Sequence, residues 1–510
     1  MRKAFHKDNH RVPLGIMLLT VFVFLFHFRF RQPGPLDETK FVPEKLAVED
    51  DNVDAPVDYG VHHAVVSSAG VSSAGVSSAG VSSAGVSSAA PPAVPSSVPT
   101  VPVEEQEESL TTDDVVLMLK TGATVLWKRL PIHLATSLSR DRIDPKNVLI
   151  YSDYPERIGS WEIIDVLANA SESARQSDTF QAYLQLEDYE SRQNYAEISN
   201  MPGDAAGPPG GWKLDKHKFL PIIQHAGRNR PRAKWYIFME DDSYIFLCNL
   251  VHHLGRFNYT DPWYLGSLAW IHGDYFAHGG SGFALSRAAW EQSFGRDPDI
   301  VERFESFTRE HGCGDHILGH VLREYGVEFG ETHGDSRFTY GFNPEPHWST
   351  WYERANWCKP VYSWHHTHSK DVARLYHLER SWDTQRGPLR YRDIFHELVA
   401  PFLRPRAEWW DNGSSKHEVR SNNAAGVQPP SSVDSPEVWR NAWKSVDACE
   451  AACVAWGECV QWSFYEDRCK MDSKVLLGSG IPEGDSRRQT SLPWTSGWFK
   501  SRVEGWTCPE

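Results

Sequence analysis

The sequence predicts an α/β fold with a mainly parallel sheet, and three apolar runs lead to this prediction. Residues 115–119 form an apolar run, VLWKRLPIHLATSL follows it as a helix, and residues 148–151 form a second run. Segments of these lengths fit a parallel strand-helix-strand unit. A third strand lies in WYIFMEDDSYIFL, residues 235–247, and it contains three consecutive acids at 240–242. Unpaired buried carboxylates are costly, so these acids must reach water or meet a cation.

The N-terminal segment is cationic and is followed by an apolar run. VPLGIMLLTVFVFLFHF, residues 12–28, contains no acid, and its length is at the short end for a membrane-spanning helix. No small-x-small cleavage site follows, which favours an uncleaved signal-anchor over a signal peptide. The charge balance predicts a cytosolic tail at 1–11, an anchor at 12–30 and a lumenal remainder, which is a single-pass type II topology.

Residues 31–112 contain repeats of VSSAG and then a proline-rich tract. Ser, Ala, Gly and Pro bury too little surface to offset the entropy of ordering. We expect a disordered stem. In the remaining 398 of the 510 residues we expect a main domain at 113–405, a linker at 406–436 and a small cysteine-containing module at 437–510. The net charge of −15 gives no basic surface for nucleic acid.

Polar residues follow the predicted strands. Thr121, Asp153 and the acids at 240–242 all stand at carboxyl ends, where ligands of parallel sheets gather. Carboxylates suit Mn²⁺ or Mg²⁺, usually shared with substrate phosphates. The alternative for the acids is a solvated acidic turn.

Three further motifs have a functional and a structural interpretation each. HGGSGFALSR, residues 278–287, brings backbone close to a ligand or forms a hairpin. Asp315 begins a helix, either as a general base or as an N-cap. YSWHHTHS offers His365, His366 and His368, either as metal ligands or as a surface histidine run.

Taken in order, FMEDDSYIF, GGSGFALS, CGDHILGHVLREYGVEFG with GDSR, and SWHH resemble the Fringe-like and core 1 β1,3-galactosyltransferase branch of glycosyltransferase family 31. The resemblance spans residues 113–376. It implies a GT-A fold with helices flanking a mixed, mainly parallel sheet. It also implies an inverting mechanism, a UDP-sugar donor, Mn²⁺ and a Golgi membrane anchor.

The resemblance also implies roles for residues. Asp315 would be the catalytic base. Relatives usually carry Asp at the first acidic position, where this chain has Glu240, and His366 competes with His365 for the histidine position. The implied binding residues are Asp242, Glu240 and His365 for metal, Asp241, Thr121 and Asp153 for nucleotide, and Gly279, Gly280, Gly282 and Trp270 for substrate.

The C-terminal CEAACVAWGECVQWSFYEDRCKM resembles a disulfide-linked α+β PAN/apple module, and a zinc knuckle is the alternative. Four cysteines allow three pairings. The resemblance implies Cys449 with Cys469 and Cys453 with Cys459. The sequence assigns no partners to Cys248, Cys313, Cys358 and Cys508. Glycosylation sequons begin at Asn169, Asn258 and Asn412.

The expected function is therefore metal-dependent transfer of a hexose or N-acetylhexosamine from a UDP-sugar to a glycan or glycoprotein hydroxyl, with a β1,3 linkage. The alternative is a catalytically inactive glycan- or wall-binding membrane protein, which Glu240 keeps open. The sequence does not identify the sugar, the acceptor or the ligand of the C-terminal module.

Overall fold

The computed structural model describes residues 109–193, 211–271, 273–330, 341–433, 435–490 and 492–508. The predicted anchor at 12–30, most of the predicted stem and the GDSR motif lie outside these ranges. Within them, no helix combines the length and the apolar character that a bilayer crossing requires.

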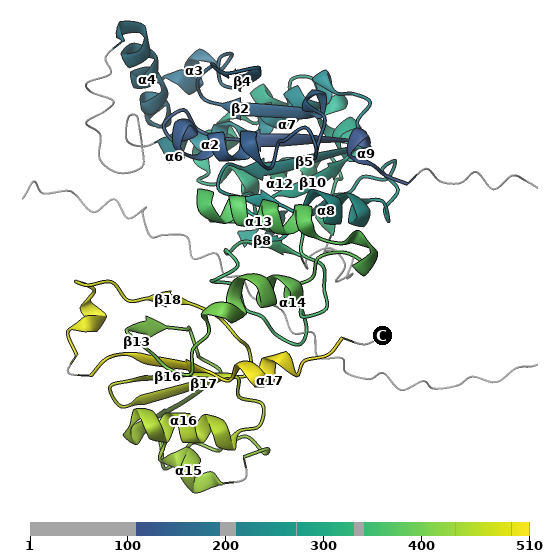
Figure 1. Cartoon of the computed structure of the whole chain (residues 1–510). Helices are drawn as coiled ribbons and strands as arrows, with labels where there is room; N and C mark the ends of the chain where they lie inside the picture. The colour runs from purple at the N-terminus through teal and green to yellow at the C-terminus, as the bar shows by residue number, and fades with distance from the viewer. Residues whose placement is uncertain are drawn as a thin grey trace, which may run out of the picture. The chain divides into compact units, whose positions relative to one another are not determined.

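A central seven-stranded sheet has the order β3-β4-β2-β1-β5-β10-β7 (Figure 1). Strands β4, β2, β1 and β5 run parallel, and the outer pairs β3–β4, β5–β10 and β10–β7 are antiparallel. The predicted mainly parallel sheet is confirmed. The strands are β1 (Val115–Lys120), β2 (Val148–Ser152), β3 (Glu156–Ile158), β4 (Trp161–Asp165), β5 (Trp235–Glu240), β7 (Tyr264–Gly266) and β10 (Phe283–Ser286).

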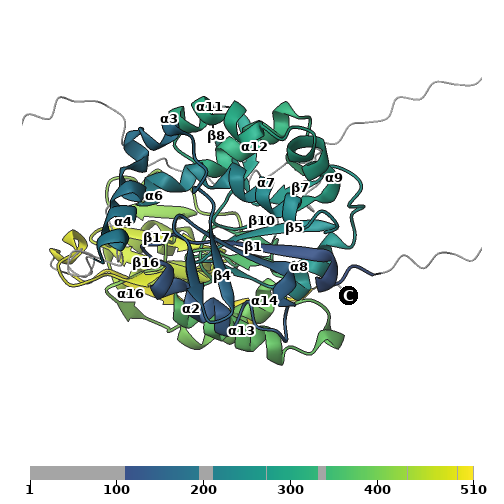
Figure 2. The same ribbon diagram turned by 90° about the horizontal axis from the view of Figure 1, so that it is seen from above.

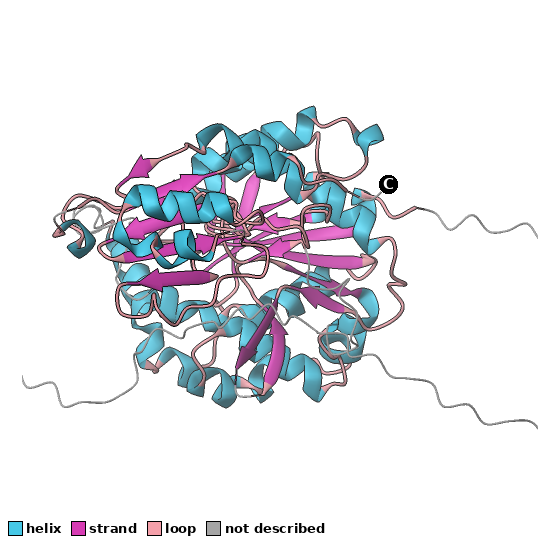
Figure 3. Cartoon of the chain, turned by 90° about the horizontal axis from the view of Figure 1, so that it is seen from below, coloured by secondary structure: helices cyan, strands magenta, loops and turns pink. Residues whose placement is uncertain are grey.

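Helices cover both faces of this sheet, which explains why β1 is apolar from Val115 to Leu119. Val116 and Met118 pack into one core with α7 (Phe219–Asn229) and α12 (Gly314–Glu324). The alternate side chains of β1 pack on the other face with α2 (Leu126–Ala135) and α8 (Leu247–Leu254). Figure 2 shows the strands between these two helical layers, and Figure 3 distinguishes helices from strands in the view from below.

A small sheet with the order β11-β12-β6 lies next to the acidic strand end. It consists of β6 (Tyr244–Ile245), β11 (Phe342–Asn343) and β12 (Ser363–Trp364). Because β6 begins two residues after Asp242 and β12 ends one residue before His365, the pairing of these strands brings the two side chains together. A separate hairpin pairs β8 (Leu268–Ile271) with β9 (Asp274–Ala277).

The C-terminal region forms a five-stranded sheet with the order β13-β19-β16-β17-β15 and carries α16 (Val446–Ala455). Its strands are β13 (Ala407–Glu408), β15 (His417–Arg420), β16 (Gln461–Tyr465), β17 (Arg468–Asp472) and β19 (Thr495–Trp498). A two-stranded pair, β14 (Trp410–Asp411) with β18 (Ser479–Gly480), accompanies it. The structure differs here from the expected linker at 406–436, because residues 407–420 contribute three strands. We refer to residues 407–508 as the C-terminal module.

The remaining helices are short or lie at the periphery. They are α3 (Glu172–Arg175), α4 (Gln181–Arg192), α6 (Gly211–Leu214), α9 (Arg287–Trp290), α10 (Ile300–Arg303), α11 (Glu305–Glu310), α13 (Ser369–Ser381), α14 (Tyr391–Ile394), α15 (Pro436–Arg440) and α17 (Lys500–Glu504).

Candidate active site

The carboxyl ends of the parallel strands bring polar side chains to one edge of the sheet. Thr121 follows β1, Asp153 follows β2 and Asp241 follows β5. The Thr121 hydroxyl donates to Asp241 Oδ2 at 2.5 Å. The backbone N–H of Ala123 donates to Asp153 Oδ1 at 2.7 Å. The three residues predicted to contact a nucleotide therefore lie at the edge where open α/β sheets bind ligands.

Two buried lysines, which sequence reasoning did not identify, lie among these groups. Lys218 Nζ donates to the Thr121 carbonyl at 3.1 Å and lies 3.4 Å from Asp153 Oδ1. Lys120 Nζ lies 2.7 Å from Asp215 Oδ2. The signal for Lys120 was present in the sequence, because it is a charged residue that closes an apolar strand, as Glu240 does.

Glu240 pairs with Lys120 across β1 and β5. The two residues are register partners in the sheet, and Lys120 Nζ lies 3.2 Å from Glu240 Oε1. Burial alone would lower the pKa of Lys120, but Asp215 and Glu240 raise it above its ordinary value. The first acid of the triplet therefore meets a cation that the protein itself supplies.

Asp242, His365 and His366 form a group with metal-ligand spacing. One potential ligand atom from each residue lies within 4.8 Å of the others, and no second such group occurs among the described residues. Glu240 is not brought into this group, in contrast to its predicted ligand role. His366 lies at a positive φ of 52° and stacks on the ring of His365 with 3.7 Å between centroids. The structure thus brings together both of the histidines that the sequence left as alternatives.

The surroundings of Asp242 favour a cation. Burial alone would raise the pKa of its carboxyl, but His365, His366 and Arg129 hold this pKa well below the usual range. Asp242 Oδ1 is buried and accepts no hydrogen bond from the described residues, although His365 Nε2 lies 3.4 Å away. A buried carboxylate oxygen without a donor is a fitting ligand for a divalent ion.

The orientation of His365 is fixed from its other side. Its backbone N–H donates to the Asn343 carbonyl at 3.0 Å, and its ring Nδ1 donates to the Pro344 carbonyl at 3.1 Å. This second hydrogen bond directs Nε2 at Asp242 and is the outer contact that metal-binding histidines usually have. The residues present therefore fit a divalent metal, and their two imidazoles suit Mn²⁺ better than Mg²⁺, which prefers oxygen ligands.

Arg129, on α2, is a further residue that sequence reasoning did not identify. Its guanidinium Nη1 lies 3.0 Å from Asp241 Oδ1 and 3.2 Å from Asp242 Oδ2. Burial raises the pKa of Asp241, as does the neighbouring Asp242, and Arg129 opposes that shift. Arg129 therefore supplies part of the positive charge that the last two acids of the triplet require.

The glycine turn at 279–282 connects the metal group to Asp315. The backbone N–H of Gly279 donates to Asp315 Oδ2 at 2.8 Å. A Cβ on Gly280 would lie 2.2 Å from His365 Cε1, so only glycine allows this approach. Gly282 has a positive φ of 78°, which glycine adopts without strain. The turn lies against both predicted site residues.

Asp315 is the second residue of α12, and Cys313 occupies the N-cap position. The alternative that Asp315 is the N-cap is therefore not what the structure shows. Its carboxylate accepts from Gly279 and from the backbone N–H of His316 at 2.9 Å, and its side chain is nearly buried. Each oxygen keeps a second lone pair, so the carboxylate retains the capacity to accept a substrate proton.

The hairpin β8–β9 displays the exposed side chain of Trp270, which is opposite the half-exposed Tyr275 across the pair. Asp274 fixes this hairpin to α12 through contacts with His316 at 3.2 Å and His320 at 3.0 Å. Trp270, predicted to contact substrate, is thus presented to solvent by a hairpin that is anchored on the helix of Asp315.

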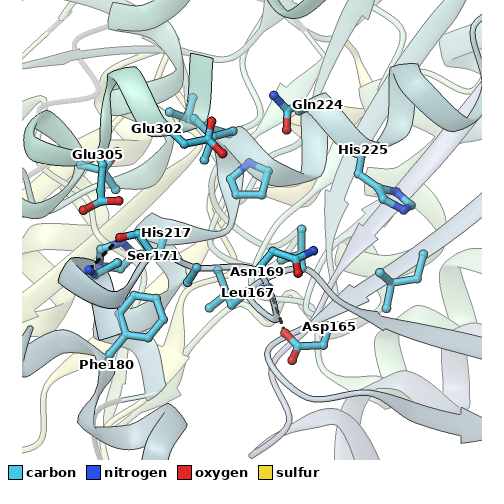
Figure 4. Close-up of a pocket in the computed structure, with 18 of the residues that line it drawn as sticks. Asp165, Leu167, Asn169, Ser171, Phe180, His217, Gln224, His225, Glu302 and Glu305 are labelled. Atoms are coloured by element: carbon cyan, nitrogen blue, oxygen red, sulfur yellow. Dashed lines mark hydrogen bonds between the residues drawn. The ribbon is translucent and has the colours of Figure 1, made fainter. Parts of the chain in front are cut away.

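A cavity of about 260 Å³ lies beyond the carboxyl end of β4, between that strand end and helices α7, α10 and α11 (Figure 4). Asp165, His217 and Glu305 contribute polar groups to its wall, and Phe180 contributes an apolar one. Of the residues that the sequence singled out, only the sequon residue Asn169 lines it together with its Ser171. The cavity is separate from the group at Asp242.

The cysteines of the C-terminal module pair as the resemblance implies, Cys449 with Cys469 and Cys453 with Cys459. A third disulfide, Cys358 with Cys508, was not expected. This pairing escaped sequence reasoning because 150 residues separate the two cysteines.

The sequons differ in accessibility. Asn169 and Asn258 are exposed. Asn412 is fully buried, and its side-chain amide donates to the Trp462 carbonyl at 3.1 Å. A glycan on Asn412 is incompatible with this packing, which corrects the prediction at that position.

A comparison with protein families matches the segment that carries the first part of this site. The matched segment begins just before β1 and ends after α12, so it covers the acidic strand end, the glycine turn and Asp315. It stops short of His365, His366 and the whole C-terminal module. Residues 110–332 match the family model described as Fringe-like, which identifies a Fringe-like domain of the glycosyltransferase family 31 type in this chain.

Proposed function

We propose that this protein is an inverting, metal-dependent glycosyltransferase that moves a hexose or N-acetylhexosamine from a UDP-sugar to a glycan or glycoprotein hydroxyl. The observation that carries the proposal is that a candidate metal-binding group and a candidate base both lie at the glycine turn. Asp242, His365 and His366 stand on one side of the glycine turn, and Asp315 is hydrogen-bonded to that turn.

The divalent ion would be Mn²⁺ or Mg²⁺, held by Asp242 with His365 or His366, and it would supply positive charge for the departing diphosphate. Arg129, beside Asp242, adds to this positive potential. Thr121, Asp153 and Asp241 would orient the nucleotide at the strand ends. Glu240 has a different role here, because Lys120 already neutralises it.

Asp315 would accept the proton of the acceptor hydroxyl. The acceptor oxygen forms a bond to the anomeric carbon, while the bond from that carbon to the diphosphate oxygen breaks and UDP leaves with the electron pair. Attack from the face opposite UDP gives a β-linked product from an α-linked donor, and we propose a β1,3 linkage. Such a positioned base contributes about 10²- to 10⁴-fold to the rate.

The compartment is also a proposal. The apolar run at 12–28 supports a Golgi membrane anchor at 12–30 with the catalytic region in the lumen. Three disulfides in the described part agree with an oxidising compartment. The nested pair of disulfides supports the proposed PAN/apple character of the C-terminal module, which would then bind glycan or protein.

The division of roles predicts two different losses. In the purified full-length protein, Asp242→Ala and Asp315→Asn should both abolish sugar transfer. Only Asp242→Ala should also abolish Mn²⁺-dependent UDP binding in calorimetry. Equal loss of UDP binding in the two variants would contradict the assignment of metal to one residue and proton transfer to the other.

Trp270 is proposed as an acceptor-stacking residue, since an exposed indole offers a large flat face. Trp270→Ala should raise the KM for acceptor about tenfold, equivalent to about 1.4 kcal/mol, with KM for donor unchanged. Phe402→Ala removes another half-exposed aromatic ring from the surface and serves as the control. A rise in the donor KM in Trp270→Ala would contradict this role.

The second candidate is the catalytically inactive glycan-binding protein. The observation that favours it is the engagement of Glu240 by Lys120, which removes one carboxylate from the metal group. Absence of UDP binding both with and without Mn²⁺, together with binding of the protein to immobilised glycans, would support this candidate.

A further inference from the structure

The candidate metal ligand His365 follows a long loop, residues 344–362, which connects β11 to β12. Both ends of this loop lie at His365. Pro344, its first residue, accepts the hydrogen bond from His365 Nδ1, and β12 runs from the last loop residue directly to His365. The position of the imidazole therefore depends on how the loop is held.

The C-terminal module holds the middle of the loop through backbone pairing. Tyr352 and Val475 exchange both of their backbone hydrogen bonds, each at 2.8 Å. The N–H of Gly478 donates to the Trp348 carbonyl at 3.0 Å. Beside this pair, Lys474 Nζ lies 2.8 Å from Glu353 Oε2.

The chain end holds the loop at a second place. The disulfide between Cys358 and Cys508 joins the loop covalently to the segment that follows α17 in the module. Next to it, the buried Trp357 donates from its indole N–H to the Trp506 carbonyl at 3.0 Å, and the two rings meet edge to face. The loop is thus fixed by an isolated antiparallel β-bridge, an ion pair, a disulfide and an aromatic contact.

One apolar core continues from these contacts to the metal group. Trp364, which immediately precedes His365, is fully buried in the same cluster as Trp357. Val475, Trp498 and Trp506 of the module belong to this cluster too. Side chains of the module therefore pack in the same core as the residue next to the ligand.

We propose that the C-terminal module is a positioning element for the metal group, acting through the 344–362 loop on His365. This inference rests on the proposed function in taking His365 as a ligand. Outer contacts that orient a ligating histidine typically change metal affinity 10- to 100-fold. The affinity of the site for Mn²⁺ should consequently depend on residues of the module that do not contact the metal-binding side chains.

The test is the full-length protein with Cys358→Ser and Cys508→Ser together. Its Mn²⁺ affinity, measured without UDP by electron paramagnetic resonance titration, should fall about tenfold. Hydrogen exchange should rise across 344–362 and at the amide of His365, which donates to the Asn343 carbonyl. Faster exchange with unchanged Mn²⁺ affinity would overturn the inference.

A less disruptive pair of single substitutions tests the inference if the double serine variant does not fold. Lys474→Ala removes the ion pair to Glu353, and Lys470→Ala removes a comparable lysine 4.0 Å from Glu418 inside the module. Only Lys474→Ala should weaken Mn²⁺ binding, by about twofold to threefold. Equal affinities in both variants would overturn the inference.

Failure of the proposed function can be told apart from failure of this inference. An unsubstituted protein that binds no Mn²⁺ contradicts the proposed function. In that case the exchange at the His365 amide still decides whether the module fixes that residue. Unchanged exchange there after loss of the disulfide would contradict the positioning role independently of the metal.

Discussion

The two sides of the candidate site are built differently. On one side, Thr121, Asp153 and Asp241 stand at the ends of neighbouring parallel strands, and the sheet register alone brings them together. On the other side, His365 reaches Asp242 through a long loop that the C-terminal module holds. The first side follows from local pattern, whereas the second depends on contacts between residues distant in sequence.

The two sides also differ in how their carboxylates are neutralised. At the strand ends, the buried cations Lys120 and Lys218 neutralise the acids within the protein itself. At Asp242, one carboxylate oxygen is buried without a hydrogen-bond donor among the described residues. The acids at the strand ends therefore already have cations close by, whereas Asp242 keeps one carboxylate oxygen that a metal ion could engage.

The largest expected effect is a loss of stability from a substitution on the side of the site that the strand ends form. Lys218→Met would leave the carboxylate of Asp153 buried without its cation, since Lys218 is fully buried. Breaking a buried pair by removing one partner costs about 3–5 kcal/mol. We expect the free energy of unfolding, measured in urea, to fall by about this amount.

Lys213→Met provides the control, because Lys213 is an exposed lysine of the same region. It should leave the free energy of unfolding within about 0.5 kcal/mol of the original. Similar losses in both variants would mean that the strand-end lysine is not the stabilising partner described here.

The next largest effect is a loss of metal affinity from a substitution in the glycine turn, which lies against His365. Gly280→Ala places a Cβ 2.2 Å from His365 Cε1 and must displace the imidazole. We expect Mn²⁺ affinity to fall about 10- to 100-fold, as it does when the orientation of a ligand is lost. Gly312→Ala is the matched control, since a Cβ there meets nothing within 4 Å. Full Mn²⁺ affinity in Gly280→Ala would place the metal away from His365.

The smallest effect tests whether Glu240 belongs to the strand-end side. Glu240→Gln removes the charge that faces Lys120, while Lys120 keeps Asp215 at 2.7 Å. Mn²⁺ affinity should change by less than about threefold, equivalent to about 0.65 kcal/mol. A loss as large as that of Asp242→Asn, measured in the same titration, would make Glu240 a metal ligand after all.

Much of the central sheet could be predicted from the sequence, because continuous apolar runs such as 115–119 and 235–239 are typical of strands covered on both faces. Thr121, Asp153 and the acids were found for the same reason. Arg129 and Lys218 were missed for different reasons. Arg129 lies on α2, whose pattern shows only an apolar face, and Lys218 is the residue that immediately precedes α7. Their roles become visible once the strand ends and helices are placed together.

The residue at which the C-terminal module begins was less predictable. The strands at 407–420 are short and have little apolar alternation, so this segment has the composition of a linker. Only pairing with β17, β18 and β19 makes them strands. The disulfide between Cys358 and Cys508 likewise depends on three-dimensional proximity, which spacing does not reveal.

The central claim is that Asp242 and its two histidines hold a divalent metal that binds the donor nucleotide. Calorimetric titration of UDP into the full-length protein, with and without Mn²⁺, tests it most directly. We predict UDP binding that requires Mn²⁺ and is lost in Asp242→Ala. UDP binding of equal strength with and without Mn²⁺, or no binding in either case, would contradict the claim.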